Sequence, residues 1–179
     1  MIVVVTIYGS IALGCVAWLS WRGGYGLILS RVVGSNPILD VAFGVAVGLV
    51  IVAATRLLTP QLAPLRRMEL ALAQTIGPMS RPTALVVAAF SAWGEELLFR
   101  AVIQPVAGLM VASVLFAVVH VPFERALWLW PVFAFGMGLL LGGLFDWTGA
   151  VLAPMTVHLV VNYLNLRQIA RRARAELRS

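Results

Sequence analysis

The chain contains no lysine and little charge of either sign. Only 11% of its 179 residues are charged, whereas 61% are hydrophobic, and the mean hydropathy is +0.98. A soluble domain averages about 25% charged residues, so this composition predicts a polytopic membrane protein. All of the basic charge is arginine, collected in linkers and in the tail. That distribution is typical of membrane orientation rather than of a nucleic-acid patch, so no nucleic-acid partner is expected.

Cysteine is almost absent as well, because Cys15 is the single one. One cysteine excludes an intramolecular disulfide framework. The stretch IALGC is faintly similar to a lipoprotein processing site, but no basic residue precedes it and the apolar run continues to Leu19. We therefore expect a signal anchor rather than a cleaved signal. The sequence also lacks an HExxH zinc motif and a GxSxG nucleophile elbow.

Long apolar runs are what the sequence does have. A hydrocarbon core about 30 Å thick needs roughly 20 residues of helix. Six segments approach that length and predict an all-α, polytopic transmembrane helix bundle of about six spans. They are Ile2 to Ser20, Pro37 to Leu58, Thr83 to Gln104, Pro105 to Val121, Ala126 to Phe145 and Ala150 to Leu166.

The linker between the second and third spans has a different character. Its centre, Leu65 to Ile76, mixes apolar and charged positions, which predicts a short amphipathic helix in the membrane interface, with a disordered linker as the alternative.

In the fifth span, Gly138 and Gly142 form a small-xxx-small pair that predicts a close helix contact. The chain is expected to form one transmembrane domain, 1–166, followed by a basic cytoplasmic tail, 167–179.

Arginine also predicts the orientation. With six spans, both termini lie on one side of the membrane, together with the second and fourth loops. That side holds Arg56, Arg66, Arg67, Arg81, Arg125, Arg167, Arg171, Arg172, Arg174 and Arg178, against Arg22 and Arg31 on the other. The bias places both termini in the cytoplasm. The lysine-free composition is typical of a GC-rich bacterial genome, so we expect the protein in a bacterial inner (cytoplasmic) membrane. The arginines of the tail either bind anionic lipid or only fix the topology.

A few polar side chains interrupt the apolar spans. A charge near the bilayer centre costs roughly 2.5–3.5 kcal/mol on insertion scales, so such residues need a partner, a cavity or a function. The interrupting residues are Glu95, Glu96, Arg100, His120, His158 and Asn162. Each alone has an ordinary structural interpretation, as a solvated ion pair or a satisfied core histidine. Gathered in one small bundle, they would satisfy one another.

Helical spacing sorts these residues into groups. Glu96 and Arg100 are four residues apart and can pair on one helical face. Glu95 is displaced by about 100° around the helix, away from any basic residue of its own helix. His158 and Asn162 are also one turn apart and face a common cavity. The spacing predicts an ion-paired scaffold at Glu96 and a reactive carboxylate at Glu95.

Three motifs in these spans resemble a known family. They are EELLFR (Glu95 to Arg100), FAVVH (Phe116 to His120) and HLVVN (His158 to Asn162). In this order they resemble the EExxxR, FxxxH and HxxxN pattern of the CAAX protease and bacteriocin-processing (CPBP) intramembrane proteases, which include the Ras-converting CAAX endopeptidases. The resemblance covers residues 91–163, in a family that commonly has eight helices.

The resemblance implies a glutamic-type intramembrane endopeptidase with its core at 83–166. Glu95 and His120 would hold and deprotonate a water, and His158 and Asn162 would stabilise the tetrahedral oxyanion, with the Glu96–Arg100 pair in support. It implies no cofactor or metal, and a membrane-anchored or lipidated protein or peptide as substrate within the lipid bilayer.

Other interpretations stay open at the level of sequence. Glu95, His120 and His158 could together form a metal site such as zinc, and Ser91 or Ser113 could pair with a histidine in a serine protease. A non-catalytic membrane partner, of the bacteriocin-immunity type or a scaffold, would use the polar cluster only as architecture. A small proton-coupled transporter would use Glu95 as a relay, although the sequence shows no internal repeat.

Overall fold

A computed structural model describes residues 2–177, which leaves Arg178 outside the described residues. The regular secondary structure of this part of the chain is all helical, with no strand, which confirms the predicted all-α bundle. The elements in order are α1 (Ile2–Val32), α2 (Pro37–Leu58), α3 (Ala63–Ile76), α4 (Arg81–Glu96), the π-helical η1 (Leu97–Ile103), α5 (Gln104–Val118), the 3₁₀ turn η2 (Arg125–Leu127), α6 (Leu129–Thr148) and α7 (Leu152–Glu176).

The chain is an integral membrane protein. Within the described residues, four segments are long and apolar enough to cross a bilayer, namely Ile2–Val32, Pro37–Leu58, Arg81–Val118 and Arg125–Thr148. The third of these contains two of the spans expected from the sequence. The sixth expected span corresponds to the first part of α7, whose polar residues keep it outside the apolar set.

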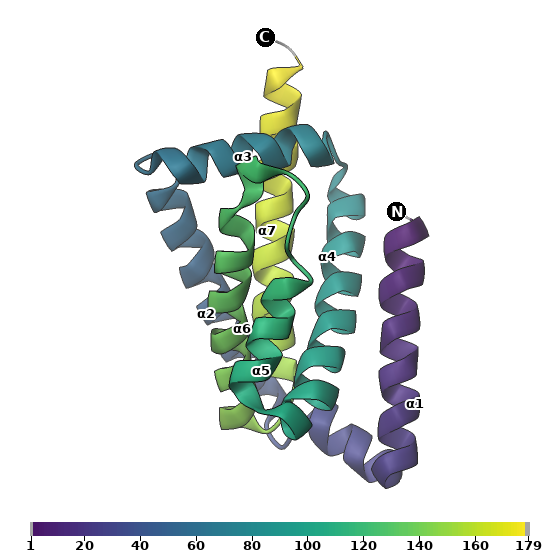
Figure 1. The fold of residues 1–179 in the computed structure, drawn as a ribbon. Coiled ribbons are helices and arrows are strands. Elements are labelled where there is room, and N and C mark those ends of the chain that lie inside the picture. The colour runs from purple at the N-terminus through teal and green to yellow at the C-terminus, as the bar shows by residue number, and fades with distance from the viewer. Residues whose placement is uncertain (1, 178–179) are drawn as a thin grey trace.

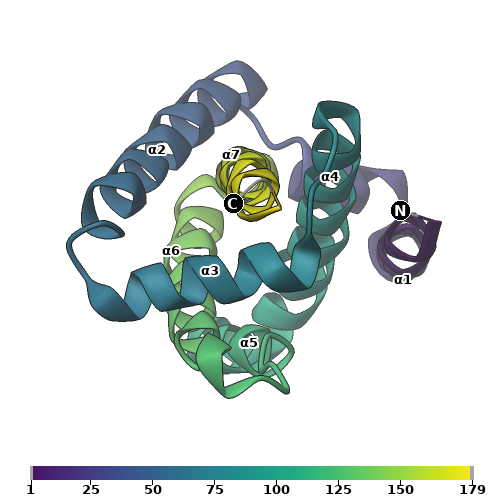
Figure 2. The same ribbon diagram turned by 90° about the horizontal axis from the view of Figure 1, so that it is seen from above.

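Helix α7 runs through the middle of the bundle, with α2, α4 and α6 around it and α1 outside α4 (Figures 1 and 2). The predicted amphipathic segment is α3, which lies across one end of the bundle and almost perpendicular to it (Figure 1). Its Ala73 packs against Ile169 and Ala173 of α7. Helix α7 also continues without a break from the sixth span into the basic tail.

The joint between the third and fourth spans lies at Gly108 rather than between Gln104 and Pro105. Gly108 has φ 83° and ψ 164°, a left-handed conformation that strongly favours glycine. Beyond it the chain turns back and runs antiparallel to α6. A Cβ at Gly138 of α6 would lie 3.0 Å from the Cα of Ser113, so Gly138 makes the predicted close helix contact.

Helix α1 is longer than the predicted first span, which was expected to end at Ser20. The helix continues to Val32 through a break at Gly24, where φ is 65°. Its last part lies across the end of the bundle opposite α3 (Figure 1), and the carbonyl of Arg31 accepts a hydrogen bond of 2.8 Å from the amide of Val151. The helical conformation of this segment was not predicted from the sequence, because its glycines and arginine are also typical of a loop.

Candidate functional site

A buried ion pair forms the base of the candidate site. Arg100 donates from Nε to Oε2 of Glu96 at 3.0 Å, and both side chains are fully buried. The other oxygen of Glu96, Oε1, lies 2.7 Å from Nδ1 of His158. Both Glu96 oxygens therefore have strong partners, as a buried carboxylate requires. The structure thus contains the ion pair predicted from the four-residue spacing.

Glu95 lies on the next face of the helix and has different neighbours. Its Oε2 is 3.6 Å from Nε2 of His120 and 3.9 Å from Nε2 of His158. The side chain is only 9% exposed, and Oε2 has no hydrogen-bond partner among the described residues. Two adjacent carboxylates thus have separate environments, one fully paired and one facing two imidazoles.

Hydrogen bonding fixes how each imidazole is presented. A carbonyl and an ionised carboxylate only accept hydrogen bonds, so His120 donates from Nδ1 to the carbonyl of Phe116 at 2.7 Å, and His158 donates from Nδ1 to Glu96. In their neutral forms, both rings then present the lone pair of Nε2 toward Glu95. When His158 is protonated its Nε2–H becomes a donor, and the two remaining acceptors, Oε2 of Glu95 and Nε2 of His120, suit a water molecule, which can donate two hydrogen bonds.

Phe116 holds the two histidines in place from the side. Its ring centroid lies 4.5 Å from that of His120 and 6.1 Å from that of His158, and Arg100 lies over the same ring at 5.4 Å. Phe99 packs edge-on against Phe116 at 5.0 Å. Phe116 of the FAVVH motif therefore contacts both histidines and Arg100, and helps to position them.

Asn162 lies one turn from His158, as the spacing predicts, but contacts α4 through another residue. Its Nδ2 donates to Oγ of Ser91 at 3.1 Å. Because α4 and α7 are antiparallel, Ser91 opposes Asn162 while Glu95 and Glu96 oppose His158. The amide nitrogen of Asn162 carries a second hydrogen, for which no acceptor occurs among the described residues.

Local helix geometry explains how one segment presents so many polar groups. The helix changes from α to π over Leu97–Ile103, directly after the two glutamates. A π segment widens the turn and is frequent at functional sites. Arg100 lies within it and reaches back to Glu96 and forward to Gln104, whose Oε1 is 3.2 Å from its Nη1.

Several residues of this network were missed by sequence reasoning. Gln104 donates from Nε2 to the carbonyl of Gly142 at 2.9 Å and to Oδ1 of Asp146 at 2.8 Å, which ties the motif helix to α6. Tyr8 of α1 interacts electrostatically with Glu95, and a Cβ on Gly94 would lie 2.9 Å from the carbonyl oxygen of Tyr8. Only the polarity of Gln104 within an apolar run could have pointed to this network.

Among the described residues, no group of three histidine, cysteine, aspartate or glutamate side chains is arranged to hold a metal ion. Glu96 and the Nδ1 atoms of both histidines are bound by protein donors and acceptors. His158 and Glu96 bond directly to each other, and His120 bonds to a main-chain carbonyl.

Comparison with known proteins places the site in a family context. Residues 78–164 match the family described as type II CAAX prenyl endopeptidase Rce1-like. The chain is also 34% identical over 90 residues to the protein YpbD of Bacillus subtilis (strain 168), an alignment covering 50% of this chain and 47% of that protein. The chain therefore spans about half the length of this curated relative. No solved structure matches the chain significantly.

Proposed function

We propose that this protein is a glutamic-type endopeptidase, because residues 78–164 match the family described as type II CAAX prenyl endopeptidase Rce1-like. It hydrolyses a peptide bond of a membrane-anchored or lipidated substrate within the bilayer. The observation that carries the proposal is the buried Glu95 oxygen, unpartnered among the described residues and directed at the Nε2 atoms of His120 and His158.

The chemistry follows from the positions of these atoms. A water held between Glu95 and His120 loses a proton to the carboxylate as its oxygen attacks the scissile carbonyl carbon. The negative charge on the former carbonyl oxygen is stabilised by the second amide hydrogen of Asn162 and by Nε2–H of protonated His158. The C–N bond then breaks, and the proton passes from Glu95 to the leaving amine.

Glu96 and Arg100 act as positioning residues in this mechanism. Glu96 holds His158 through Nδ1, and Arg100 holds Glu96. A residue already bound to a cation and an imidazole is a poor base, because its lone pairs are occupied. The adjacent Glu95 has an oxygen without such partners among the described residues, so we assign the base to Glu95.

The substrate is expected to enter the site laterally, between helices. The proposed reaction needs no metal ion. Activity that survives treatment with a strong zinc chelator, with no stoichiometric metal in the purified protein, would support this assignment. Activity lost to the chelator and restored by zinc would overturn it and make Glu95, His120 and His158 a ligand set.

The decisive experiment compares cells producing the native chain with cells producing Glu95→Gln at equal membrane levels. New peptide termini in membrane and secreted proteins are mapped by mass spectrometry. A general base contributes about 100- to 10,000-fold, so we expect cleavage to fall below detection. Glu124→Gln is the matched control, because Glu124 belongs to the linker before η2 and is exposed.

The same experiment tests the alternative of a non-catalytic membrane partner. Termini that depend on Glu95 would support the protease and identify its substrate. Identical termini with folded native and Glu95→Gln proteins would overturn the protease proposal. In that case, loss of the Glu96–Arg100 pair should damage the protein more than Glu95→Gln does.

A further inference from the structure

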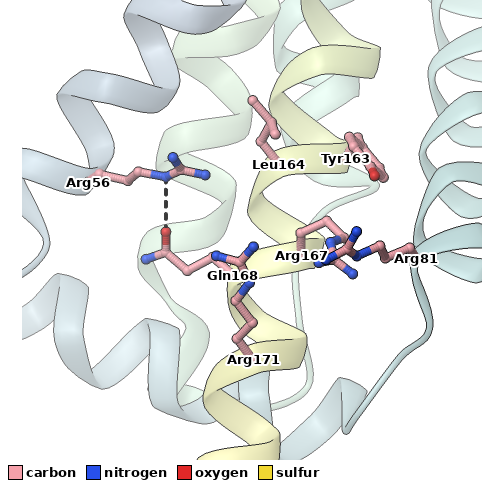
Figure 3. A pocket seen from close by; sticks show the side chains of 7 residues that line it. All are labelled: Arg56, Arg81, Tyr163, Leu164, Arg167, Gln168 and Arg171. Atoms are coloured by element: carbon pink, nitrogen blue, oxygen red, sulfur yellow. Dashed lines mark hydrogen bonds between the residues drawn. The ribbon is translucent and has the colours of Figure 1, made fainter.

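A second polar site lies away from the glutamates, between α2, α4 and α7. It is a cavity of about 260 Å³ with four arginines in its wall, two of them from α7 (Figure 3). We call it the arginine pocket; its lining residues are Arg56, Arg81, Tyr163, Leu164, Arg167, Gln168 and Arg171.

The charge of the arginine pocket is not neutralised by the protein. Among the described residues, no carboxylate lies within ion-pair distance of these four guanidinium groups. Arg56 donates to Oε1 of Gln168 at 3.2 Å, and Gln168 in turn donates to Glu69 at 2.9 Å. Glu69 is therefore bound to the amide of Gln168. Figure 3 shows Arg81 of α4 and Arg167 of α7 reaching toward each other, although like charges repel.

Arginines farther along α7 behave differently. Arg172 pairs with Glu176 at 3.3 Å, and Arg174 donates to the carbonyl of Met79 at 2.6 Å. The basic segment of α7 thus divides into arginines with partners in the protein and arginines that face the pocket. The arginines that face the pocket can therefore form a specific binding site, distinct from the general electrostatic attraction of a basic tail to an anionic membrane.

The level of the pocket in the bundle indicates what it meets. Arg56 lies in the last turn of α2 and Arg81 is the first residue of α4. Arg167 and Arg171 flank Ile169, which packs against α3, the helix that lies across the end of the bundle (Figure 1). Helix ends and an amphipathic crossing helix mark the membrane–water interface, where phospholipid phosphates lie. Tyr163 is also typical of this level.

From these contacts we infer that the arginine pocket binds the phosphate of an anionic phospholipid headgroup. Guanidinium groups bind phosphate through paired, charge-assisted hydrogen bonds. The pocket is smaller than a cavity for a drug-sized ligand but has room for a phosphate and part of its glycerol. Leu164, which lies one turn toward the bundle interior from Gln168, provides an apolar wall for the start of the acyl chains.

The test uses the full chain in vesicles of phosphatidylcholine with one fifth phosphatidylglycerol, followed by extraction and native mass spectrometry of retained lipid. The pocket variant is Arg167→Gln with Arg171→Gln. The control is Arg172→Gln with Arg174→Gln, which removes the same charge from the same helix. Each basic residue near a membrane surface contributes roughly fivefold to affinity for anionic lipid, so the pocket variant should retain phosphatidylglycerol about 30-fold more weakly.

The control variant should retain phosphatidylglycerol as the native chain does, and phosphatidylcholine should be retained by none of them. Equal loss in both variants would overturn the inference, because it would show a general charge effect. Unchanged retention in the pocket variant would also overturn it. Inorganic phosphate is added in a separate arm. Displacement of the lipid by phosphate at millimolar concentration would make the site one for free phosphate and overturn the lipid assignment.

Folding of each variant is checked by circular dichroism and size exclusion. Should the double variant aggregate, the single substitutions Arg56→Gln and Arg81→Gln decide, because both side chains are exposed and lie at helix ends. Each should weaken retention about fivefold. Retention equal to that of the native chain in both would refute the inference.

Discussion

The buried pair of Glu96 and Arg100 allows a quantitative prediction. Both side chains are 0% exposed, at a separation of 3.0 Å. Removing one member of a buried ion pair leaves an uncompensated charge and costs about 3–5 kcal/mol. We expect that penalty for Arg100→Met and a similar one for Glu96→Gln, which also disturbs the bond to His158.

The double variant Glu96→Gln with Arg100→Met should be less damaged than the sum of the two single variants. It leaves no unpaired charge, so we expect a coupling free energy of about 2–3 kcal/mol. The assay is reversible unfolding of the purified protein in mixed micelles, followed by near-ultraviolet circular dichroism. The free energies of unfolding of all four proteins complete a double-mutant cycle.

A matched surface pair is the control. Arg172 and Glu176 have the same four-residue spacing, but their side chains are 48% and 45% exposed. An exposed pair contributes about 0–1 kcal/mol, so Arg172→Met should change the free energy of unfolding by less than 1 kcal/mol. Equal effects at both pairs, or additive effects in the Glu96–Arg100 cycle, would refute the interpretation of Arg100 as a buried counter-ion.

Two further predictions concern helix contacts. Tyr8→Phe removes a hydroxyl that interacts electrostatically with the proposed base, Glu95. A polar contact contributes about 0.5–1.5 kcal/mol, so kcat should fall severalfold, up to about tenfold, while KM stays near native; unchanged kcat would refute a positioning role. Gly138→Leu places a side chain against the α5 backbone and should cost about 1–3 kcal/mol of stability, whereas Gly136→Leu, where a Cβ would meet nothing within 4 Å, should cost less than 1 kcal/mol; equal thermal shifts would contradict the close contact.

The sequence predicts those features that depend on local spacing. The apolar runs predict the helices, and the four-residue intervals predict the Glu96–Arg100 pair and the shared face of His158 and Asn162. The amphipathic pattern also predicts α3, which the structure places from Ala63 to Ile76. These features need only the helical repeat and the cost of burying polar groups.

Features that depend on contacts between distant segments were not predictable in the same way. The bond from Gln104 to Asp146 joins residues 42 positions apart, and the arginine pocket joins α2 to α7 across more than one hundred positions. The turn at Gly108 also escaped prediction, because a glycine in an apolar run is typical both of a tightly packed helix and of a reversal. Only its φ of 83° distinguishes the two.

The contrast between Glu95 and Glu96 shows how tertiary contacts complete a distinction that the helix begins. Consecutive helical positions differ by about 100°, so two identical side chains face different neighbours. Glu96 faces Arg100 and His158, and both of its oxygens are used in holding other groups. Glu95 faces two imidazoles whose Nδ1 atoms are already engaged, which leaves Nε2 of each directed at one oxygen. In the proposed site, Glu96 keeps His158 in place beside Glu95, as an outer-shell group orients a group that acts directly.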